Sequence, residues 1–228
     1  MTSQIYKEMF ENAVHIGHRR QKWNPMMKKY IYGEKDGLHI INLESTYKLL
    51  ENALNYISGL VSEGKTILFI STKPQSIKLI EDLANSVNMP YVTTKWISGL
   101  LTNFSTMKSR IKYYINLKEQ EASGELDKYK KNEISKFKKE ITKLETSLGG
   151  VKNMNSMPDA VFIVDVVRDK VVAKEAKKLR IPVIALVDTN SDPSLVDYPI
   201  PSNDDAIKAL TYMLGKIKTA LMSSKSKK

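Results

Sequence analysis

The most complete motif match in this chain is to the P-loop, a phosphate-binding motif, but its structural context does not fit. Residues 59–66 (GLVSEGKT) match the G-x-x-x-x-G-K-[ST] pattern of P-loop proteins. That loop binds phosphate because a strand enters it and a helix leaves it, so that loop amides and the helix N-terminus face the anion. Here a helical pattern precedes the motif and a β-rich run follows it. We therefore expect Gly64 to end a helix and Lys65 to lie on the surface, without a phosphate site.

Two histidines and a group of acids are the remaining candidates for metal chemistry. His15 and His18 could share one helical turn, but no acid or third imidazole stands nearby in the sequence to complete a site. Residues 188–192 (DTNSD) have the alternating acids of a calcium loop, but Pro193 and Pro199 stand where its turning glycine and bidentate glutamate belong. The sequence therefore favours packing roles for the histidines and a structural turn for the acids, with no metal and no cofactor.

The common catalytic motifs are absent from the sequence. Without cysteine the chain has no thiol nucleophile, disulfide or thiolate metal site. No G-x-G-x-x-G follows a predicted strand, and no G-x-S-x-G elbow is present. We predict that the protein is not an enzyme. One enzymatic alternative stays open, namely an α/β enzyme that binds a nucleotide or sugar phosphate at strand ends near Thr72, Asp165 and Asp188.

Basic residues outnumber acidic ones and gather around aromatic residues. The chain has 36 Lys and Arg against 25 Asp and Glu, a net charge of +11, and a pI near 9.5. This balance favours a polyanionic partner, nucleic acid above all. Cations neutralise phosphates, and aromatic rings stack on splayed bases. The first basic cluster, which contains no acid, holds Arg19, Arg20, Lys22, Lys28 and Lys29 with Trp23. The second holds Lys95, Lys108, Arg110 and Lys112 with Trp96.

The chain has the composition of a folded protein without a membrane anchor. Apolar residues make up 42% of it, enough for a sizeable core. No apolar run approaches the roughly 20 residues of a membrane span, and the first ten residues lack the pattern of a signal peptide. We expect a soluble, intracellular protein with no membrane partner.

Short β-rich runs alternate with helical patterns after an irregular N-terminal segment. Such alternation predicts a parallel sheet with helices on both faces, an open α/β sandwich. The runs typical of buried strands are 66–71, 90–94, 160–165 and 183–187, with a short extended piece at 198–200. The helical apolar stripes lie along 47–61, 77–87, 172–179 and 207–221, the last helix being expected to start at 202–205.

Between Thr102 and Leu148 the alternation stops, and two helical patterns follow each other. Their apolar residues step by three and four, which predicts an antiparallel coiled-coil hairpin that ends at Gly149-Gly150. Its lysine-rich outer face is typical of a solvated helix. The expected organisation is a sandwich domain of residues 1–101 and 149–222, with an RNA-binding segment at about 1–43, a hairpin of 102–148 and a disordered basic tail of 223–228.

Ordered blocks along almost the whole sequence resemble the bacterial-type small-subunit ribosomal protein S-two family. Each block alone is a weak signal, but together and in order they are very specific. The blocks are 15–18 (HIGH), 23–27 (WNPMM), 39–44 (HIINLE), 100–104 (LLTNF), 148–150 (LGG), 157–160 (MPDA), 188–193 (DTNSDP) and 200–206 (IPSNDDA).

This resemblance implies a flavodoxin-like open parallel sheet with an inserted coiled-coil hairpin. It also implies a structural role in cytoplasmic ribosomes, where the protein would bind small-subunit rRNA between head and body and contact other small-subunit proteins. The large mRNA-binding protein S-one is an expected partner, and no catalysis is implied. A free mRNA regulator remains a further alternative. Three polar residues of the matching blocks, Asn24, Thr102 and Asn103, complete the candidate RNA-binding set.

Overall fold

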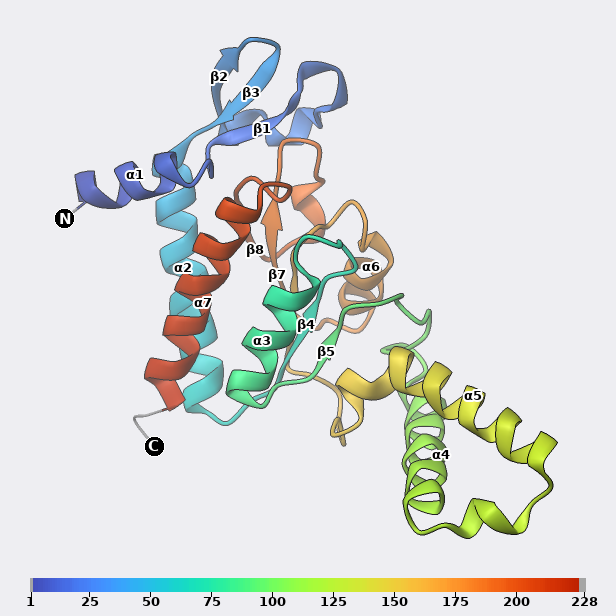
Figure 1. Cartoon of the computed structure of the whole chain (residues 1–228). Coiled ribbons are helices and arrows are strands. Elements are labelled where there is room, and N and C mark those ends of the chain that lie inside the picture. The colour runs from blue at the N-terminus through green and yellow to red at the C-terminus, as the bar shows by residue number, and fades with distance from the viewer. Residues whose placement is uncertain (1, 226–228) are drawn as a thin grey trace.

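A five-stranded parallel sheet forms the centre of the computed structural model, which describes residues 2–225 (Figure 1). Its strand order is β5-β4-β6-β7-β8. Counted along the chain, this order is second, first, third, fourth and fifth, as in flavodoxin-like folds, so the predicted fold class is confirmed. The strands are β4 (Ile67–Ile70), β5 (Tyr91–Val92), β6 (Ala160–Ile163), β7 (Val183–Val187) and β8 (Tyr198–Pro201).

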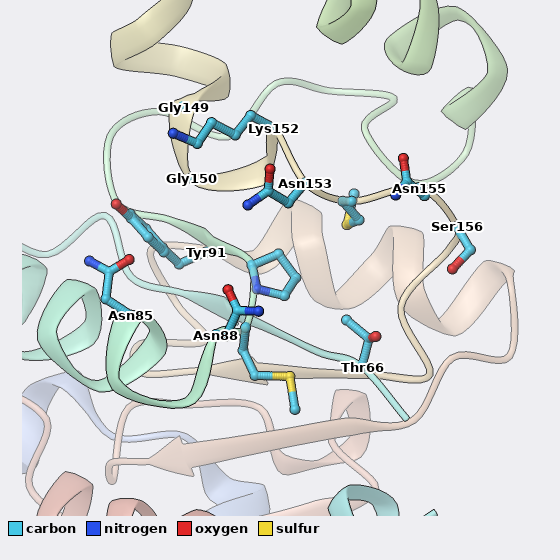
Figure 2. A pocket seen from close by; sticks show the side chains of 13 residues that line it. Thr66, Asn85, Asn88, Tyr91, Gly149, Gly150, Lys152, Asn153, Asn155 and Ser156 are labelled. Atoms are coloured by element: carbon cyan, nitrogen blue, oxygen red, sulfur yellow. The ribbon is translucent and has the colours of Figure 1, made fainter. Parts of the chain in front are cut away.

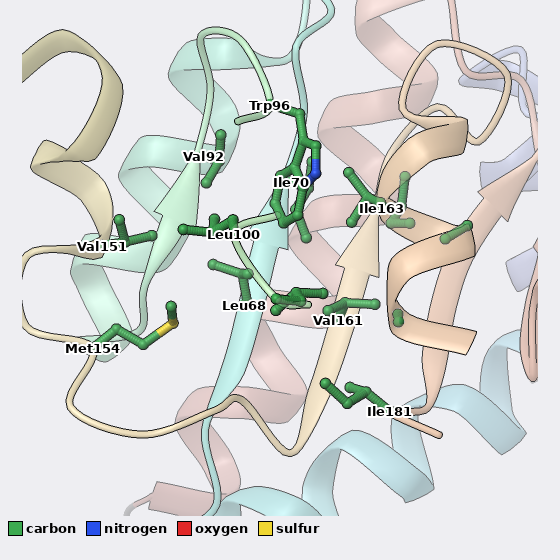
Figure 3. Close-up of a cluster of buried hydrophobic side chains, with 14 of the residues drawn as sticks. Leu68, Ile70, Val92, Trp96, Leu100, Val151, Met154, Val161, Ile163 and Ile181 are labelled. Atoms are coloured by element: carbon green, nitrogen blue, oxygen red, sulfur yellow. The ribbon is translucent and has the colours of Figure 1, made fainter. Parts of the chain in front are cut away.

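The central strands are buried on both faces, as their unbroken apolar sequences predict. Every residue of β4, β6 and β7 is buried. On one face, Ile67 and Phe69 pack into a core with α1 (Thr2–Glu11), α2 (Leu43–Ser62), α3 (Ile77–Val87) and α7 (Ile207–Lys225). On the other face, Leu68 and Ile70 pack into a second core that includes α6 (Lys170–Lys178) and the loop after β5 (Figure 3).

The P-loop-like motif has the structure of a helix end followed by a strand. The helix α2 ends at Ser62, and Gly64 turns the chain with φ of +75°. Lys65 pairs with Glu63 at 2.6 Å, and β4 begins at Ile67. The helix enters this motif and the strand leaves it, which is the reverse of the order in a P-loop. The predicted helix end at Gly64 and the surface position of Lys65 are confirmed.

The N-terminal segment is ordered, which the expectation of an irregular start missed. A three-stranded antiparallel sheet follows α1, with strand order β1-β3-β2. Its strands have four or five residues and bulged register, so the alternation that marks longer strands is absent from the sequence. These elements are β1 (Ile16–Arg19), β2 (Ile31–Lys35) and β3 (Leu38–Ile41), with the 3₁₀ helices η1 (Arg20–Lys22) and η2 (Pro25–Tyr30) between β1 and β2.

Two helices project from the sheet where the hairpin is predicted (Figure 1). They are α4 (Phe104–Ala122) and α5 (Lys131–Leu148), joined through the short 3₁₀ helix η3 (Glu125–Lys128), and we call them the α4–α5 pair. Met107, Ile111 and Tyr114 of α4 are buried, as are Ile141 and Leu144 of α5. The two helices contact each other. That they form a coiled coil, and that the chain divides into the expected domains, remain predictions.

The C-terminal helix differs from its prediction at both ends. It begins at Ile207 rather than at 202–205, because the Asn203 side chain accepts hydrogen bonds from the amides of Asp205 and Ala206 and forms a turn there. Ile207 is 61% exposed and so lies outside the buried stripe. The helix continues to Lys225, so the first half of the expected disordered tail is helical, and residues 226–228 lie outside the described residues.

A close approach at Gly17 holds β1 against the loop that follows β7. A Cβ atom at this position would lie 2.5 Å from Thr189 Cγ2 and 3.1 Å from the His39 carbonyl oxygen. The neighbouring amide of His18 donates a hydrogen bond to Thr189 Oγ1 at 2.9 Å. The lack of a side chain at Gly17 therefore lets the two segments meet.

We predict that Gly17→Ala lowers the free energy of unfolding by about 1–3 kcal/mol, because the added methyl group overpacks this contact. Urea denaturation measures the loss. Gly33→Ala is the matched control, since a Cβ atom there meets no other atom of the described residues within 4 Å. Equal stability of the two variants would show that β1 tolerates a shift away from Thr189.

Candidate nucleic-acid interface

The first basic cluster lies along one segment, from the last residue of β1 through η1 and η2. Its five cations are all exposed, although Arg20 lies 3.6 Å from Glu34 and the Lys29 ammonium lies 4.8 Å from the centre of the Tyr30 ring. These cations are Arg19, Arg20, Lys22, Lys28 and Lys29.

Buried neighbours fix this cluster to the domain. Met27 is fully buried and Tyr30 is 8% exposed, so the chain carrying Lys28 and Lys29 is anchored on both sides of the two lysines. Asn24, by contrast, already makes hydrogen bonds within the protein through both its side chain and its backbone. Its side chain caps η2 by accepting from the Met26 amide at 3.0 Å, and its own amide donates to the Thr189 carbonyl at 2.8 Å. The exposed cations therefore stand on a rigid segment.

Trp23 lies partly exposed at the side of the same cluster. Its ring centre is 5.3 Å from that of His39, and the two ring planes are tilted by 54°. Because the ring is half-buried, part of its surface is accessible for stacking next to the cations.

The second basic cluster follows β5 and continues into the first turns of α4. Lys95, Lys108 and Arg110 are exposed, as are Thr102 and Asn103. Lys108 Nζ donates to the carbonyl oxygen of Asn155 at 2.9 Å, which ties α4 to the chain that leaves α5. These five candidates therefore all lie exposed on the segment from the loop after β5 to the first turns of α4.

Trp96 is the exception among the candidates, and the prediction of a stacking role is corrected for it. The side chain is only 9% exposed and packs in the core over the strands (Figure 3). Its Nε1 donates to Glu175 Oε1 at 3.1 Å. A basic sequence context suggested an aromatic contact for RNA, but the ring serves the core instead.

Glu175 of α6 holds the loop of the second basic cluster, a role that the sequence analysis did not predict. Besides Trp96, its carboxylate accepts from the amides of Gly99, Leu101 and Thr102 and from the Thr102 hydroxyl, at 2.8–3.3 Å. Burial opposes the charge, but these donors outweigh it and lower the pKa of Glu175. Because Glu175 lies more than seventy residues from the loop in sequence, local patterns could not reveal the contact.

Both basic clusters are attached to the same side of the central sheet. Met27 and Tyr30, which anchor the first cluster, belong to the same core as Leu100 and Met107, which flank residues of the second. The opposite face of the sheet is covered by α2, α3 and α7. The segments that carry the two clusters are therefore supported by the same core.

Acidic residues from three strand ends meet at the carboxyl edge of the sheet. The Lys73 ammonium lies 2.7 Å from Asp204, 2.6 Å from Asp205 and 3.2 Å from Asp165. His18 contacts Asp188 through Nδ1 at 3.1 Å and Asp205 through Nε2 at 3.3 Å. We call these residues the carboxyl-edge network.

Burial and mutual repulsion set the protonation of this network. Burial, reinforced by the Asp188 and Asp165 charges, raises the pKa of Asp204 to about 7. Burial disfavours the Lys73 charge, but the surrounding carboxylates outweigh this effect and raise the pKa of Lys73. The hydrogen bond to Asp188 raises the pKa of His18.

Three residues of the network have the arrangement of metal ligands. One potential ligand atom from each of His18, Asp188 and Asp204 lies within 4.8 Å of the others. Asp204 Oδ2 is buried and has no hydrogen-bond partner among residues 2–225, so it could bind a cation. The sequence argument against a metal relied on acids being distant from the histidines, which is wrong for the folded chain. His15 lies apart, with its ring stacked on that of Phe10 at 4.2 Å.

The strand ends do not favour the enzymatic alternative. Thr72 donates to Asp169 at 2.8 Å, and Asp165 is paired with Lys73. Since the acids gathered around Lys73 and His18 repel phosphate, this edge does not suit a phosphate ligand.

Comparison with known proteins decides the family. Residues 9–224 match the family model described as Ribosomal protein S2. The chain belongs to the ribosomal protein S2 family. It is therefore a structural protein of the small ribosomal subunit and not an enzyme.

Bacterial relatives cover nearly the whole chain. The Small ribosomal subunit protein uS2 of Dehalococcoides mccartyi is 40% identical over 220 residues, which are 96% of this chain and 90% of the relative. The protein of the same name from Hahella chejuensis is 45% identical over 210 residues, 92% of this chain and 83% of the relative. That from Coprothermobacter proteolyticus is 42% identical over 219 residues, 96% and 82% of the two chains. Among residues 2–225, no helix combines the length and the apolar character needed to cross a membrane.

We predict that Glu175→Gln lowers the free energy of unfolding by about 2–3 kcal/mol at neutral pH, because charged hydrogen bonds are lost and buried donors lose an acceptor. The lowered pKa makes this stabilisation fully present above the ordinary pKa of 4.5, and it is lost as the pH falls through the folded-state value. The gap between wild type and variant should therefore narrow in acid.

Urea denaturation between pH 3 and 8 measures this gap. Glu51→Gln, which changes an exposed residue of α2, is the control and should leave stability unchanged at neutral pH. The proposed role of the carboxylate would be contradicted if wild type and Glu175→Gln had the same free energy of unfolding at pH 7. A difference between them that grows in acid would contradict it as well.

Proposed function

We propose that the protein binds small-subunit rRNA through its two basic clusters and thereby links the head and the body of the subunit. One observation carries the proposal, namely that the cations of both clusters are exposed while their neighbours are buried in one core on one side of the sheet. A rigid support of this kind keeps the two sets of charges at a fixed separation. Two RNA segments bound to them would be held in a fixed relative geometry.

The first basic cluster supplies phosphate contacts beside an aromatic ring. Arg and Lys neutralise phosphates, and this electrostatic contribution dominates the affinity of RNA-binding proteins. Trp23 offers its accessible face to an unpaired base next to these contacts. Side chains do not reach the base edges in the deep major groove of an RNA helix, so shape and single-stranded elements would provide the specificity.

The second basic cluster provides the other attachment point. Lys95, Lys108 and Arg110 contribute charge, while Thr102 and Asn103 contribute polar groups to the same region. Glu175 fixes the loop between β5 and α4, so little ordering cost would accompany binding. The α4–α5 pair extends from this point and would set the angle at which the protein docks.

The expected partners follow from the family. The relatives are named as small ribosomal subunit proteins, which supports contacts of this chain with rRNA and with neighbouring ribosomal proteins. We extend the proposal to the large mRNA-binding protein S-one and to ribosomes of the cytoplasm.

The variant Arg19→Glu with Arg20→Glu tests the role of the first basic cluster. We predict that it lowers the affinity for small subunits depleted of this protein by on the order of 10-fold or more, because two phosphate contacts become repulsive. Co-sedimentation at several salt concentrations measures the affinity. Wild-type binding should weaken as salt rises, with a steeper slope than that of the variant.

The matched control is Lys48→Glu with Lys78→Glu, which makes the same charge change at exposed positions on α2 and α3, on the opposite side of the sheet. It should bind almost as well as the wild type. An equal loss of affinity in both variants would show that the effect depends on net charge alone. No loss of affinity in either variant would contradict the proposed interface. A wild-type protein found mostly off the ribosome on mRNA would favour the free-regulator alternative.

A further inference from the structure

A polar cavity of about 360 Å³ lies at the amino ends of β4 and β5, away from the carboxyl edge described above (Figure 2). It is next to the base of the α4–α5 pair. One wall is formed by the end of α3 and the start of β5, which carry Asn85, Asn88 and Tyr91. The facing wall is the chain that leaves α5, residues 149–156. Its volume lies within the range of about 300–1,000 Å³ that is typical of small-ligand sites.

Amide side chains dominate the rim of this cavity. They are Asn85 and Asn88 on one wall and Asn153 and Asn155 on the other (Figure 2). All four residues are exposed, and within residues 2–225 their side chains make no hydrogen bond to the protein. An amide offers N–H donors and a carbonyl acceptor together, which is the pattern that pairs with the edges of nucleobases.

The electrostatics of the cavity suit an anionic ligand. The described residues that line it include Lys152 but no carboxylate, although Asp159 stands at its margin and accepts from the amide of the lining residue Thr66 at 2.8 Å. Lys108 stands at its margin, because its ammonium donates to the carbonyl of the lining residue Asn155 at 2.9 Å. One member of the second basic cluster, where the proposed function puts RNA phosphates, therefore borders the cavity, and the two lysines outnumber the single marginal carboxylate.

The two walls are held together by a close backbone contact. A Cβ atom at Gly150 would lie 2.3 Å from the Tyr91 carbonyl oxygen and 2.7 Å from its ring, so only glycine permits this approach. Asn88 has a φ of 54° at the end of α3, a left-handed backbone conformation that sets the direction of its Cα–Cβ bond. Met89, Pro90 and Met154 add apolar surface between the amides. The cavity is therefore preformed.

We infer that this cavity binds one unpaired nucleotide of the small-subunit rRNA, with the base between the asparagine amides and its phosphates near Lys152 and Lys108. The inference rests on the proposed function and deepens it, because it gives the second basic cluster a site for a single-stranded element. Unstacked bases bound through their edges and faces are the usual means of sequence-specific RNA recognition. The apolar surface and the Tyr91 ring would contact the base, and the amides would select its edge.

Chemical probing of rRNA in small subunits tests this inference. Subunits depleted of this protein are rebuilt with the wild type or with Asn88→Gly and Asn153→Ala combined. Glycine keeps the left-handed conformation at position 88 while removing the amide. Dimethyl sulfate and a carbodiimide report the base edges, and hydroxyl radicals report the backbone.

We expect the wild type to protect one unpaired base that the double variant leaves as reactive as in depleted subunits. The backbone protection by the first basic cluster should persist, and affinity should fall by no more than about 10-fold, as for the loss of one base contact. Asn52→Ala, which removes an exposed amide of α2, should keep the base protection. Circular dichroism confirms that the variants are folded.

Unchanged base protection by the double variant would overturn the nucleotide site. If Arg19→Glu with Arg20→Glu still weakened binding in that case, the proposed function would stand without it. The absence of any wild-type footprint on rRNA would instead contradict the proposed function itself.

Discussion

Buried carboxylates that bind polar groups from distant segments are the constraint on which the rest of this structure depends. A buried charge without hydrogen-bond partners costs free energy. The fold is therefore stable only when the donors that surround Asp188 and Glu175 stay in place. Asp188 is 1% exposed and contacts His18, which directly precedes the first basic cluster. Glu175 is 9% exposed and accepts from the loop that carries the second. A strongly basic protein thus uses acids in its interior to position the cations on its surface.

The same constraint explains why the segment that carries the first basic cluster is held in place without a large hydrophobic core of its own. Four of the five cations of the first basic cluster, all but Arg19, stand on short 3₁₀ turns, which would be marginal in isolation. Gly17 and Thr189 bring these turns against the parallel sheet, and Met27 extends the core beneath them. Rigid cations lose little entropy when they bind a polyanion, so this support serves affinity as well as folding.

The sequence predicted the parallel sheet because strands buried on both faces leave an unbroken apolar signal, as in 160–163 and 183–187. The exposed lysines and arginines were identified equally well, since local charge needs no tertiary information. The burial of Trp96 could not be predicted, because it depends on an acceptor in α6 that lies 79 residues away. The acids around His18 were missed for the same reason, because Asp188 and Asp205 lie 170 and 187 residues away in the sequence.

Crosslinking in intact small subunits, with the adducted residues mapped by mass spectrometry, tests the central claim most directly. The account predicts rRNA adducts in both basic clusters, at residues such as Lys22, Trp23 and Lys95, and none on the α2 and α3 residues Lys48 and Lys78. Adducts concentrated on the α2, α3 and α7 side of the sheet, with both clusters unmodified, would contradict it.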